Sequence, residues 1–581
     1  MQGAGKCCRN SYVFPSPRTQ DWQSCQDCQS SLCEQDRHPP PPVHLARSPV
    51  QCVSMKHRGY LYFTVFSAGM TTLAIEFSAS RLLGSVFGTS NLVWASIIGL
   101  ILIYLTAGYF IGGWWADRSP HPKTFYTILV WGALLAGLVP VLSGPVLRLA
   151  ADAFDALQVG VLLGAFTAVL ILLSVPITLL GVVSPFAIRL SLRDSREAGK
   201  ISGRIYAIST LGSFLGTFLP VLVVIPLLGT RLTFLTFGLF LALVAWLGFW
   251  IFGEKRAFWV HAWIPLALLA LGVFWGRAPI KTTAGQIYET ESAYNYIQVI
   301  QDGDYRYLRL NEGQGIHSVH HPVQLAYHGP WMQFVAAPFF NPAIYTPKQV
   351  ESYAIIGLAA GTTARQVTAV YGAIPIDGYE IDPEIIRVGQ EYFAMTEPNL
   401  HPIAEDGRVG LAHSGKRYTV IGIDAYRPPY IPWHLTTQEF YRQVYDHLTE
   451  DGVLVINVGR APEDRRLIAA LAGTIGTVFP SVYVVDIPNT FNSIIYATRQ
   501  PTTLDDLYRN YQALVERGDA HPLLLQALET AILNMQPNPC AGEAPDADCV
   551  VFTDDWAPIE WITNSLVLNY LFSPEGMEEI Q

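Results

Sequence analysis

The chain has 581 residues, of which 50% are hydrophobic and only 14% are charged, whereas soluble proteins carry about 25% charged residues. This composition excludes an intrinsically disordered protein and argues against a wholly soluble one. Residues 59–280 contain 13 basic and 7 acidic residues, a net charge of +6, whereas residues 281–581 contain 17 and 36, a net charge of −19. So acidic a segment repels nucleic acid, and we expect no nucleic-acid partner.

Residues 1–58 have no periodic apolar pattern and include four consecutive prolines. We expect this segment either to be disordered or to lie upstream of the true translation start, for which Met55 is the candidate because a basic stretch and an apolar run follow it. That apolar run is too long for a signal peptide. Cys25, Cys28 and Cys33 have a spacing found in metal sites, but no fourth ligand is well placed, so we expect no metal.

Residues 59–280 predict a membrane domain of about seven transmembrane helices. A membrane-spanning helix needs about 20 predominantly apolar residues. Small residues are scattered through the apolar stretches, and Gly212 and Gly216 have the spacing that lets membrane helices approach closely. The stretches are residues 60–83, 91–115, 124–147, 158–183, 205–228, 232–252 and 258–276.

Two ionisable side chains in the first stretch are candidate functional residues of the membrane domain. Glu76 lies deep in that stretch and Arg81 near its end. An ionisable residue inside a bilayer is costly and is therefore a functional candidate by default. The alternative for Glu76 is a structural hydrogen bond between helices.

The distribution of basic residues predicts a cytoplasmic N-terminus. Loops on the N-terminal side of the membrane carry eleven Lys and Arg residues and those on the other side carry three, and basic loops stay in the cytoplasm. Seven spans would then place the acidic C-terminal region outside. Cys540 and Cys549 have a separation that suits a disulfide, which persists in oxidising compartments. An even number of spans would place the region inside, and the sequence leaves both placements open.

From residue 285 onward, strands alternate with helices. Residues 294–300 and 305–310 predict a β-hairpin, and residues 482–485 and 493–496 predict a second one. Between them, alternating strands and helices indicate a Rossmann-like parallel sheet with helices on both faces, and residues 501–581 form a C-terminal helical extension. The predicted strands are residues 353–356, 374–381, 418–424 and 453–457, and the predicted helices are residues 363–371, 383–393, 437–448 and 462–477.

Polar and small residues follow these strands where ligands bind in such sheets, beyond the carboxyl ends. Gly357 and Gly361 bracket a turn after the first strand, where small residues let a ligand approach the backbone. Glu380 ends the next strand, where an acid can accept both hydroxyls of a ribose.

Two further acids complete the candidate site. Asp406, followed by Gly407, can accept a hydrogen bond from an adenine amine, and Asp424 ends the strand at 418–424. Their order at strand ends indicates an adenosine-type ligand. The missing third glycine and the placement of the acids favour an S-adenosyl compound over NAD.

Residues 285–500 resemble the spermidine synthase family, in which an N-terminal β-hairpin precedes a sheet of the S-adenosylmethionine methyltransferase type. Residues 59–565 as a whole resemble bacterial membrane proteins in which several helices are fused to a spermidine synthase-like domain. The stretches that carry the resemblance are residues 73–83, 112–118, 379–383, 423–426, 431–440 and 553–560, the last reading Thr-Asp-Asp-Trp-Ala-Pro-Ile-Glu.

The resemblance implies transfer of an aminopropyl group from decarboxylated S-adenosylmethionine to a small-molecule amine, with no tightly bound cofactor. Glu380 would bind the ribose, Asp406 the adenine, and Asp424 would act as the catalytic base. His317 stands where the family often has a glutamine, and Tyr327 matches its substrate-loop tyrosine. The implied location is the bilayer of the bacterial inner (cytoplasmic) membrane, and whether the chain forms a homo-oligomer is left open.

Three acids of the family pattern are missing from this chain. Ala360 stands about where an aspartate grips the ammonium of the donor, Arg427 replaces the second acid after Asp424, and Gly329 replaces a glutamate. We therefore expect an aminopropyl or a methyl transferase, with S-adenosylmethionine or its decarboxylated form as co-substrate and an unknown acceptor. The alternative is a catalytically degenerate ligand-binding domain attached to a transporter-like membrane domain.

Overall fold

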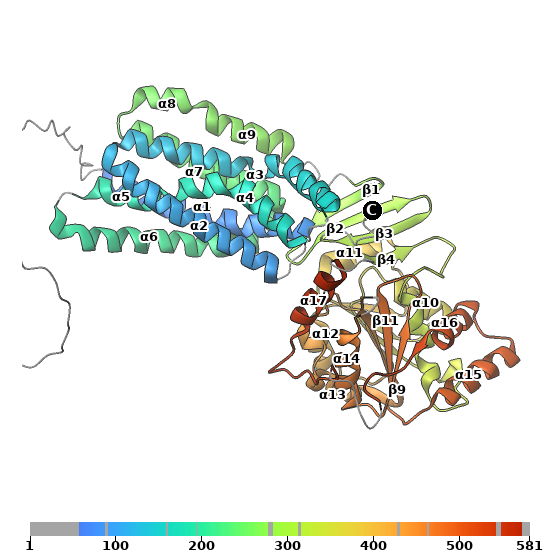
Figure 1. The fold of residues 1–581 in the computed structure, drawn as a ribbon. Helices are drawn as coiled ribbons and strands as arrows, with labels where there is room; N and C mark the ends of the chain where they lie inside the picture. Colours follow the sequence, from blue (N-terminus) through green and yellow to red (C-terminus); the bar gives the residue numbers. More distant parts are fainter. Residues whose placement is uncertain are drawn as a thin grey trace, which may run out of the picture. The chain divides into compact units, whose positions relative to one another are not determined.

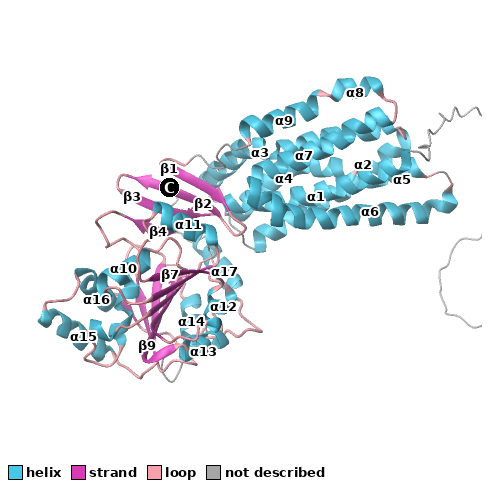
Figure 2. Ribbon diagram, turned by 180° about the vertical axis from the view of Figure 1, so that it is seen from behind, coloured by secondary structure: helices cyan, strands magenta, loops and turns pink. Residues whose placement is uncertain are grey.

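A computed structural model of the chain (Figure 1) describes residues 57–87, 91–157, 161–192, 194–276, 283–311, 315–426, 430–461, 464–541 and 548–571. The predictions for the N-terminal cysteines, for Met55 and for Arg427 lie outside these residues. The described residues before 277 are helical, and those from 283 onward contain two sheets, drawn in magenta in Figure 2.

The helical part consists mainly of long apolar helices. Apolar residues cover every face of these helices, which is typical of helices that span a membrane or lie in a protein core. Within the described part of the chain, five helices are long and apolar enough to cross a membrane. One of them, residues 198–251, comprises α6 and α7 and contains a break inside α7 at Gly229, whose positive φ of 81° is not helical. The helices are α1 (Arg58–Phe87), α2 (Asn91–Arg118), α3 (Pro122–Leu157), α4 (Val161–Gly181), α5 (Val183–Ser191), α6 (Ala198–Leu219), α7 (Ile225–Ile251), α8 (Lys255–His261) and α9 (Trp263–Trp275).

Small residues bring α1 and α6 into close contact, as the spacing of Gly212 and Gly216 predicts. Both glycines are buried. A Cβ atom at Gly212 would lie 2.0 Å from the carbonyl oxygen of Phe66, and one at Gly216 would lie 2.1 Å from that of Met70. The two backbones therefore pack with no room for a side chain at either position.

A four-stranded antiparallel sheet, in the order β1-β2-β3-β4, begins the α/β part. Strands β2 (Tyr296–Asp302) and β3 (Tyr305–Leu310) pair around a turn at Gly303, as the alternating pattern predicts. The sequence analysis missed the outer strands β1 (Gln286–Glu291) and β4 (Ile316–His320). The inner face of this sheet packs on α11 (Pro383–Tyr392) through Ile297, Leu308 and Val388.

The second sheet has eight strands in the order β12-β10-β11-β9-β8-β5-β6-β7. The five strands from β9 to β7 are parallel, and β11, β10 and β12 are antiparallel, which confirms the predicted parallel sheet and its terminal hairpin. Strands β7 and β12 are additions to the prediction. The strands are β5 (Tyr353–Ile356), β6 (Ile376–Glu380), β7 (Leu400–Ala404), β8 (Tyr418–Ile423), β9 (Leu448–Gly459), β10 (Ser481–Asp486), β11 (Asn492–Thr498) and β12 (Met535–Gln536).

Helices cover both faces of this sheet because successive side chains of its buried strands point to opposite faces. Tyr353 and Ile355 belong to the core under α10, α15, α16 and the 3₁₀ segment Trp331–Phe340. Ala354 and Ile356 belong to the core under α12, α13, α14 and α17. The helices are α10 (Thr362–Tyr371), α12 (Gly407–His413), α13 (Gln438–Asp446), α14 (Arg466–Gly476), α15 (Leu504–Arg517), α16 (Pro522–Leu533) and α17 (Ile559–Leu571).

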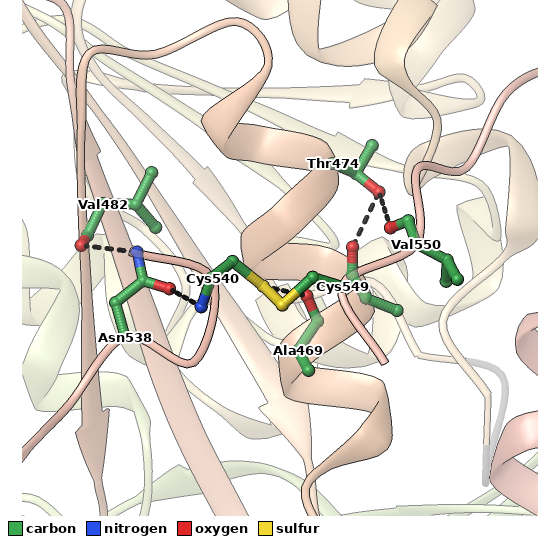
Figure 3. The surroundings of a disulfide bond; sticks show 8 residues. Ala469, Thr474, Val482, Asn538, Cys540, Cys549 and Val550 are labelled. Atoms are coloured by element: carbon green, nitrogen blue, oxygen red, sulfur yellow. Dashed lines mark hydrogen bonds between the residues drawn. A yellow bond between two sulfur atoms is a disulfide. The ribbon is translucent and has the colours of Figure 1, made fainter. Parts of the chain in front are cut away.

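A disulfide between Cys540 and Cys549 cross-links the segment between β12 and α17, and Cys540 packs against Ala469 of α14 (Figure 3). The Asn538 side chain accepts a hydrogen bond from the Cys540 amide at 2.9 Å and donates one to the Val482 carbonyl. Thr474 of α14 accepts a hydrogen bond from the Phe552 amide at 3.0 Å. The C-terminal region thus contributes a strand and a cross-link besides its helices.

The contact between α1 and α6 predicts opposite effects of alanine at two glycines of α6. Gly212→Ala should lower the stability of the detergent-solubilised protein by about 1–3 kcal/mol, because the methyl group overlaps the backbone of α1. The matched control is Gly203→Ala, where nothing lies within 4 Å of the new Cβ. That change should be neutral or stabilising by up to about 1 kcal/mol. Equal unfolding temperatures for the two variants would contradict the packing described.

Candidate functional site

A cavity of about 430 Å³ lies at the carboxyl ends of β5, β6 and β8. The register of the parallel strands creates it, because Ile356 of β5 pairs with both Tyr379 of β6 and Ile423 of β8. The residues that follow these strands therefore meet at one edge. The polar residues that line the cavity are Arg81, Asn295, His317, Glu380, Asp406, Asp424, His434 and Glu560, and its aromatic residues are Tyr294, Tyr379, Tyr426, Tyr430 and Trp433.

The loop after β5 brings its backbone to the cavity. Gly357 has a φ of +87°, and a Cβ atom there would lie 2.4 Å from the Asp424 carbonyl oxygen, so this position requires glycine. Ala359, which also has a positive φ, lines the cavity beside it. Gly361 caps the start of α10 with a φ of +85° and is not among the lining residues.

Glu380 ends β6 and is buried against the same loop. Its carboxylate accepts hydrogen bonds from the Ala359 amide at 3.0 Å and from the Asp382 amide at 3.2 Å. Burial raises the pKa of Glu380 to about 7, and the two amides oppose that shift. The carboxylate can exchange its proton near neutral pH, and it faces the cavity as predicted.

Asp406 and Gly407 begin α12 at the cavity. Asp406 caps the helix by accepting from the amides of Arg408 and Val409, and its other oxygen lies 2.8 Å from His434 Nε2. The bond to His434 lowers the pKa of Asp406, so this carboxyl stays ionised. A Cβ at Gly407 would lie 2.2 Å from Ile356, which keeps the turn against β5.

Asp424 follows β8 and is half-buried in the cavity wall. The Asn457 side chain of β9 donates a hydrogen bond to its carboxylate at 2.8 Å. Burial raises the pKa of Asp424 to about 6, partly opposed by that bond. Asp424 is therefore a carboxylate at neutral pH that can still accept a proton, which is what a general base requires.

His317 of β4 lines the cavity with a polar atom that has no partner among the described residues. Its Nε2 is inaccessible to solvent and makes no hydrogen bond. Burial lowers the pKa of His317 to about 4, so the ring is neutral at physiological pH. A neutral imidazole can donate or accept one hydrogen bond from a bound molecule, as the glutamine expected at this position could.

Other predicted positions do not reach the cavity. The Tyr327 hydroxyl accepts from the His321 amide and donates to the Gln324 carbonyl at 2.7 Å, and this residue does not line the cavity. Ala360 packs in the core under the four-stranded sheet, with Ala359 facing the cavity instead. Gly329 has a φ of +142° and lies against the Trp331 ring.

Of the two candidate residues in α1, only Arg81 lines the cavity. Glu76 is half-buried among the helices, with no hydrogen-bond partner among the described residues, and lies away from the cavity. Arg81 lines the cavity and donates hydrogen bonds to the carbonyls of Ser292 and Ala293. A residue of the apolar helices thus belongs to the wall of the site in the α/β part.

Sequence reasoning missed three polar residues of the cavity: Asn295, His434 and Glu560. Glu560 lies in the stretch 553–560, whose Asp554 forms an ion pair with Arg408 at 2.7 Å. In the sequence, that stretch indicates only the family resemblance. Its three charged residues in eight were the available signal, and the fold was needed to show that it returns to the edge of the sheet.

The cavity combines four carboxylates, an aromatic wall and the exposed backbone of the loop after β5. Carboxylates can accept from hydroxyl and amine groups and can neutralise a cation. Tyrosine and tryptophan rings offer faces on which a base or a sulfonium can stack. The arrangement suits a nucleotide that carries hydroxyls and a positive charge.

Residues 341–505 match the family model of the spermine/spermidine synthase domain. A probable polyamine aminopropyl transferase of Bifidobacterium longum is 32% identical over 288 residues, which are 47% of this chain and 61% of that protein. The chain thus spans about three fifths of the length of that relative. A polyamine aminopropyltransferase of Vibrio vulnificus is 28% identical over 282 residues, 47% of this chain and 89% of that protein.

Among solved structures, a spermidine synthase of Thermotoga maritima is 20% identical, with a TM-score of 0.35 over 43% of this chain and 84% of that one. The family match and the curated relatives agree with the resemblance drawn from the motifs. The α/β part of this chain therefore contains a spermine/spermidine synthase domain, related to polyamine aminopropyltransferases.

Proposed function

We propose that the α/β part binds an S-adenosyl-type nucleotide and transfers its aminopropyl or methyl group to an amine, while residues 59–280 anchor it in a membrane. The single observation that carries the proposal is the cavity that gathers Gly357, Glu380, Asp406 and Asp424 from four separate segments. In this assignment Glu380 accepts from the ribose hydroxyls and Asp406 from the adenine amine. The co-substrate is S-adenosylmethionine or its decarboxylated form.

The reaction is a displacement at the carbon next to the sulfonium. The amine must be neutral to attack, and Asp424 takes the proton that it loses. The carbon–sulfur bond breaks and the sulfur keeps the electron pair, leaving a neutral thioether. Holding the two reactants in one cavity supplies the proximity that such a displacement needs.

The cavity favours a donor whose binding does not require a carboxylate to hold an aminopropyl ammonium group. The loop that would carry the gripping aspartate presents Ala359 to the cavity, with Ala360 buried beside it. Neither side chain can bind an ammonium group. Ordinary synthesis of spermidine from putrescine is therefore expected to be slow.

Membrane anchoring is supported by the outer surface of the helices. Large apolar side chains such as Phe110, Leu227 and Phe274 are more than 70% exposed on it. So wide an apolar surface needs lipid or another protein to cover it. We assign the domains accordingly as residues 59–280, 281–500 and 501–581, the last returning to the sheet through β12.

One set of observations favours the alternative, a ligand-binding domain outside the cell. Arg118, Lys123, Lys255 and Arg256 lie at one end of the helices, whereas Arg81 lies at the end that contacts the α/β part. Basic ends stay in the cytoplasm, which would place the α/β part outside. The Cys540–Cys549 bond fits an oxidising compartment as well.

Replacing Glu380 tests the nucleotide site. Glu380→Ala in the purified full-length chain should weaken binding of S-adenosylmethionine, or of its decarboxylated form, by about 1.5–3 kcal/mol, because a charged hydrogen-bond acceptor is lost. Isothermal titration measures the change. The matched control is Glu384→Ala, four residues on, which removes a half-buried partner of Arg387 outside the cavity. Equal affinity of the wild type and Glu380→Ala would remove the assignment of Glu380.

Activity and its pH dependence test the role of Asp424. Transfer should rise as pH increases through about 6, because the base acts as a carboxylate, which predominates above its raised pKa. Asp424→Asn should abolish transfer, and Asp446→Asn, at the exposed end of α13, should not change it. Release of the thioether product is the measurement.

Brisk conversion of putrescine by the wild type would contradict the expected loss of polyamine specificity.

Thiol labelling separates the two placements of the α/β part. In cells that express the chain with its six cysteines before residue 53 replaced by serine, a membrane-impermeant reagent should label Cys540 and Cys549 only after reduction if they form an external disulfide. The variant with serine at both positions is the control for background. Labelling only after lysis, without any reductant, would place the domain inside and favour the transferase over the exported binding domain.

A further inference from the structure

We propose that the acceptor amine is the head group of a membrane lipid, which enters the cavity from the bilayer surface. This inference rests on the proposed function and names the acceptor class of the same site. It starts from the loop between β1 and β2, residues 291–295, which touches two apolar helices and also forms one wall of the cavity.

Both helices hold this loop by hydrogen bonds. At the end of α1, Arg81 donates to the carbonyls of Ser292 and Ala293, the latter at 3.1 Å. In α7, directly after the break at Gly229, the Thr230 amide donates to the carboxylate of Glu291, the last residue of β1, at 2.6 Å. The loop is thus fixed at the level of Arg81 in α1 and of the break in α7.

That level corresponds to the head-group region of a bilayer. Helix α1 has 30 residues, which at 1.5 Å per residue is about 45 Å, the thickness of a bilayer with its polar regions. Arg81 lies six residues before the end of α1, about 9 Å from it. A lysine or arginine at this depth lies among the head groups.

The same loop forms part of the cavity wall. Ala293, Tyr294 and Asn295 of the loop line it together with Arg81. The loop is also tied to the nucleotide side of the site, because Ser292 and Asn295 both donate to the Asp382 carboxylate, at 2.5 and 2.9 Å. A head group at the membrane surface therefore lies beside the entrance, and a water-soluble amine has no such advantage.

Four exposed apolar or aromatic side chains belong to the cavity lining or directly follow it in the chain, and we call them the rim: Tyr294, Ile381, Trp433 and Trp561. Their exposed fractions are 48%, 43%, 47% and 68%. The first three line the cavity, and Trp561 follows the lining residue Glu560. Tryptophan and tyrosine prefer the interface between membrane and water, where one end of the ring is apolar and the other is wet.

The charge inside the cavity selects an ammonium head group. Glu380, Asp406, Asp424 and Glu560 line it, and Arg81 is the sole described cationic side chain at its wall apart from the histidines. An amine-bearing lipid presents one ammonium group, which loses its proton to Asp424. Its nitrogen then bonds to the carbon of the S-adenosyl donor, and the carbon–sulfur bond breaks with its electron pair on sulfur.

Reconstituted full-length chain tests the acceptor. It is placed in vesicles of phosphatidylethanolamine and phosphatidylcholine, or of phosphatidylcholine alone, whose quaternary nitrogen cannot accept. The donor, S-adenosylmethionine or its decarboxylated form, is radiolabelled in the transferable group. We expect label in the lipid fraction of the first vesicles only, and at least about tenfold less label in added putrescine or ethanolamine, because neither is concentrated at the membrane surface.

Trp561→Ala should lower lipid labelling on the order of tenfold, with donor affinity by titration unchanged, because an aromatic anchor at the interface is lost. Tyr508→Ala, an exposed aromatic of α15 that is 46% exposed and away from the cavity, is the matched control and should have no effect.

Failure of the inference is distinguishable from failure of the proposed function. Donor binding with labelling of soluble amines but not of lipid would overturn the lipid acceptor and leave the transferase standing. Donor binding without any labelled product would overturn the lipid acceptor and the transferase together. Absence of donor binding would overturn the nucleotide site itself, and the inference with it.

Discussion

The parallel register of β5, β6 and β8 is the constraint on which the site depends. Because Ile356 pairs with both Tyr379 and Ile423, the chain leaves all three strands at the same edge. The Asp424 amide donates to the Ile356 carbonyl at 2.8 Å, and the Gly357 amide donates to the Tyr379 carbonyl at 2.9 Å, so the ladder continues into the loops. A shift of one residue in any strand would turn an acid away from the cavity.

This register explains why the sequence could predict the acids that end strands but not the residues that arrive from elsewhere. Asp424 directly follows a buried apolar strand and Glu380 is the last residue of a buried strand, so their positions follow from where these strands end. Tyr327 and Ala360 depend instead on how a loop packs, and neither reaches the cavity. Glu560 comes from a segment more than 130 residues beyond Asp424, a contact that no local pattern encodes.

The same division holds for the fold. Hydrophobic composition and periodicity predict the long apolar helices and the buried strands. In contrast, β4, β7 and β12 are short and include polar residues or proline. Such strands form because a neighbouring edge offers hydrogen bonds, as β10 does for Met535 and Gln536. The break at Gly229 was likewise hidden inside an apolar run, since its cause is a backbone conformation and not a change in polarity.

The loop at 291–295 connects the apolar helices, whose outer surface suits lipid, with the α/β part, whose surface suits water. Arg81 belongs to an apolar helix, yet it donates hydrogen bonds to carbonyls of the α/β part. The network continues from the Ser292 hydroxyl to the Asp382 carboxylate and from the Asp382 amide to the Glu380 carboxylate. Asp382 is fully buried, so its charge is tolerated only because several donors surround it. Displacing the helix end would remove donors from that network and disturb the wall beside Glu380. The position of the helices and the shape of the cavity are therefore linked through one buried carboxylate, on whichever side of the membrane the α/β part lies.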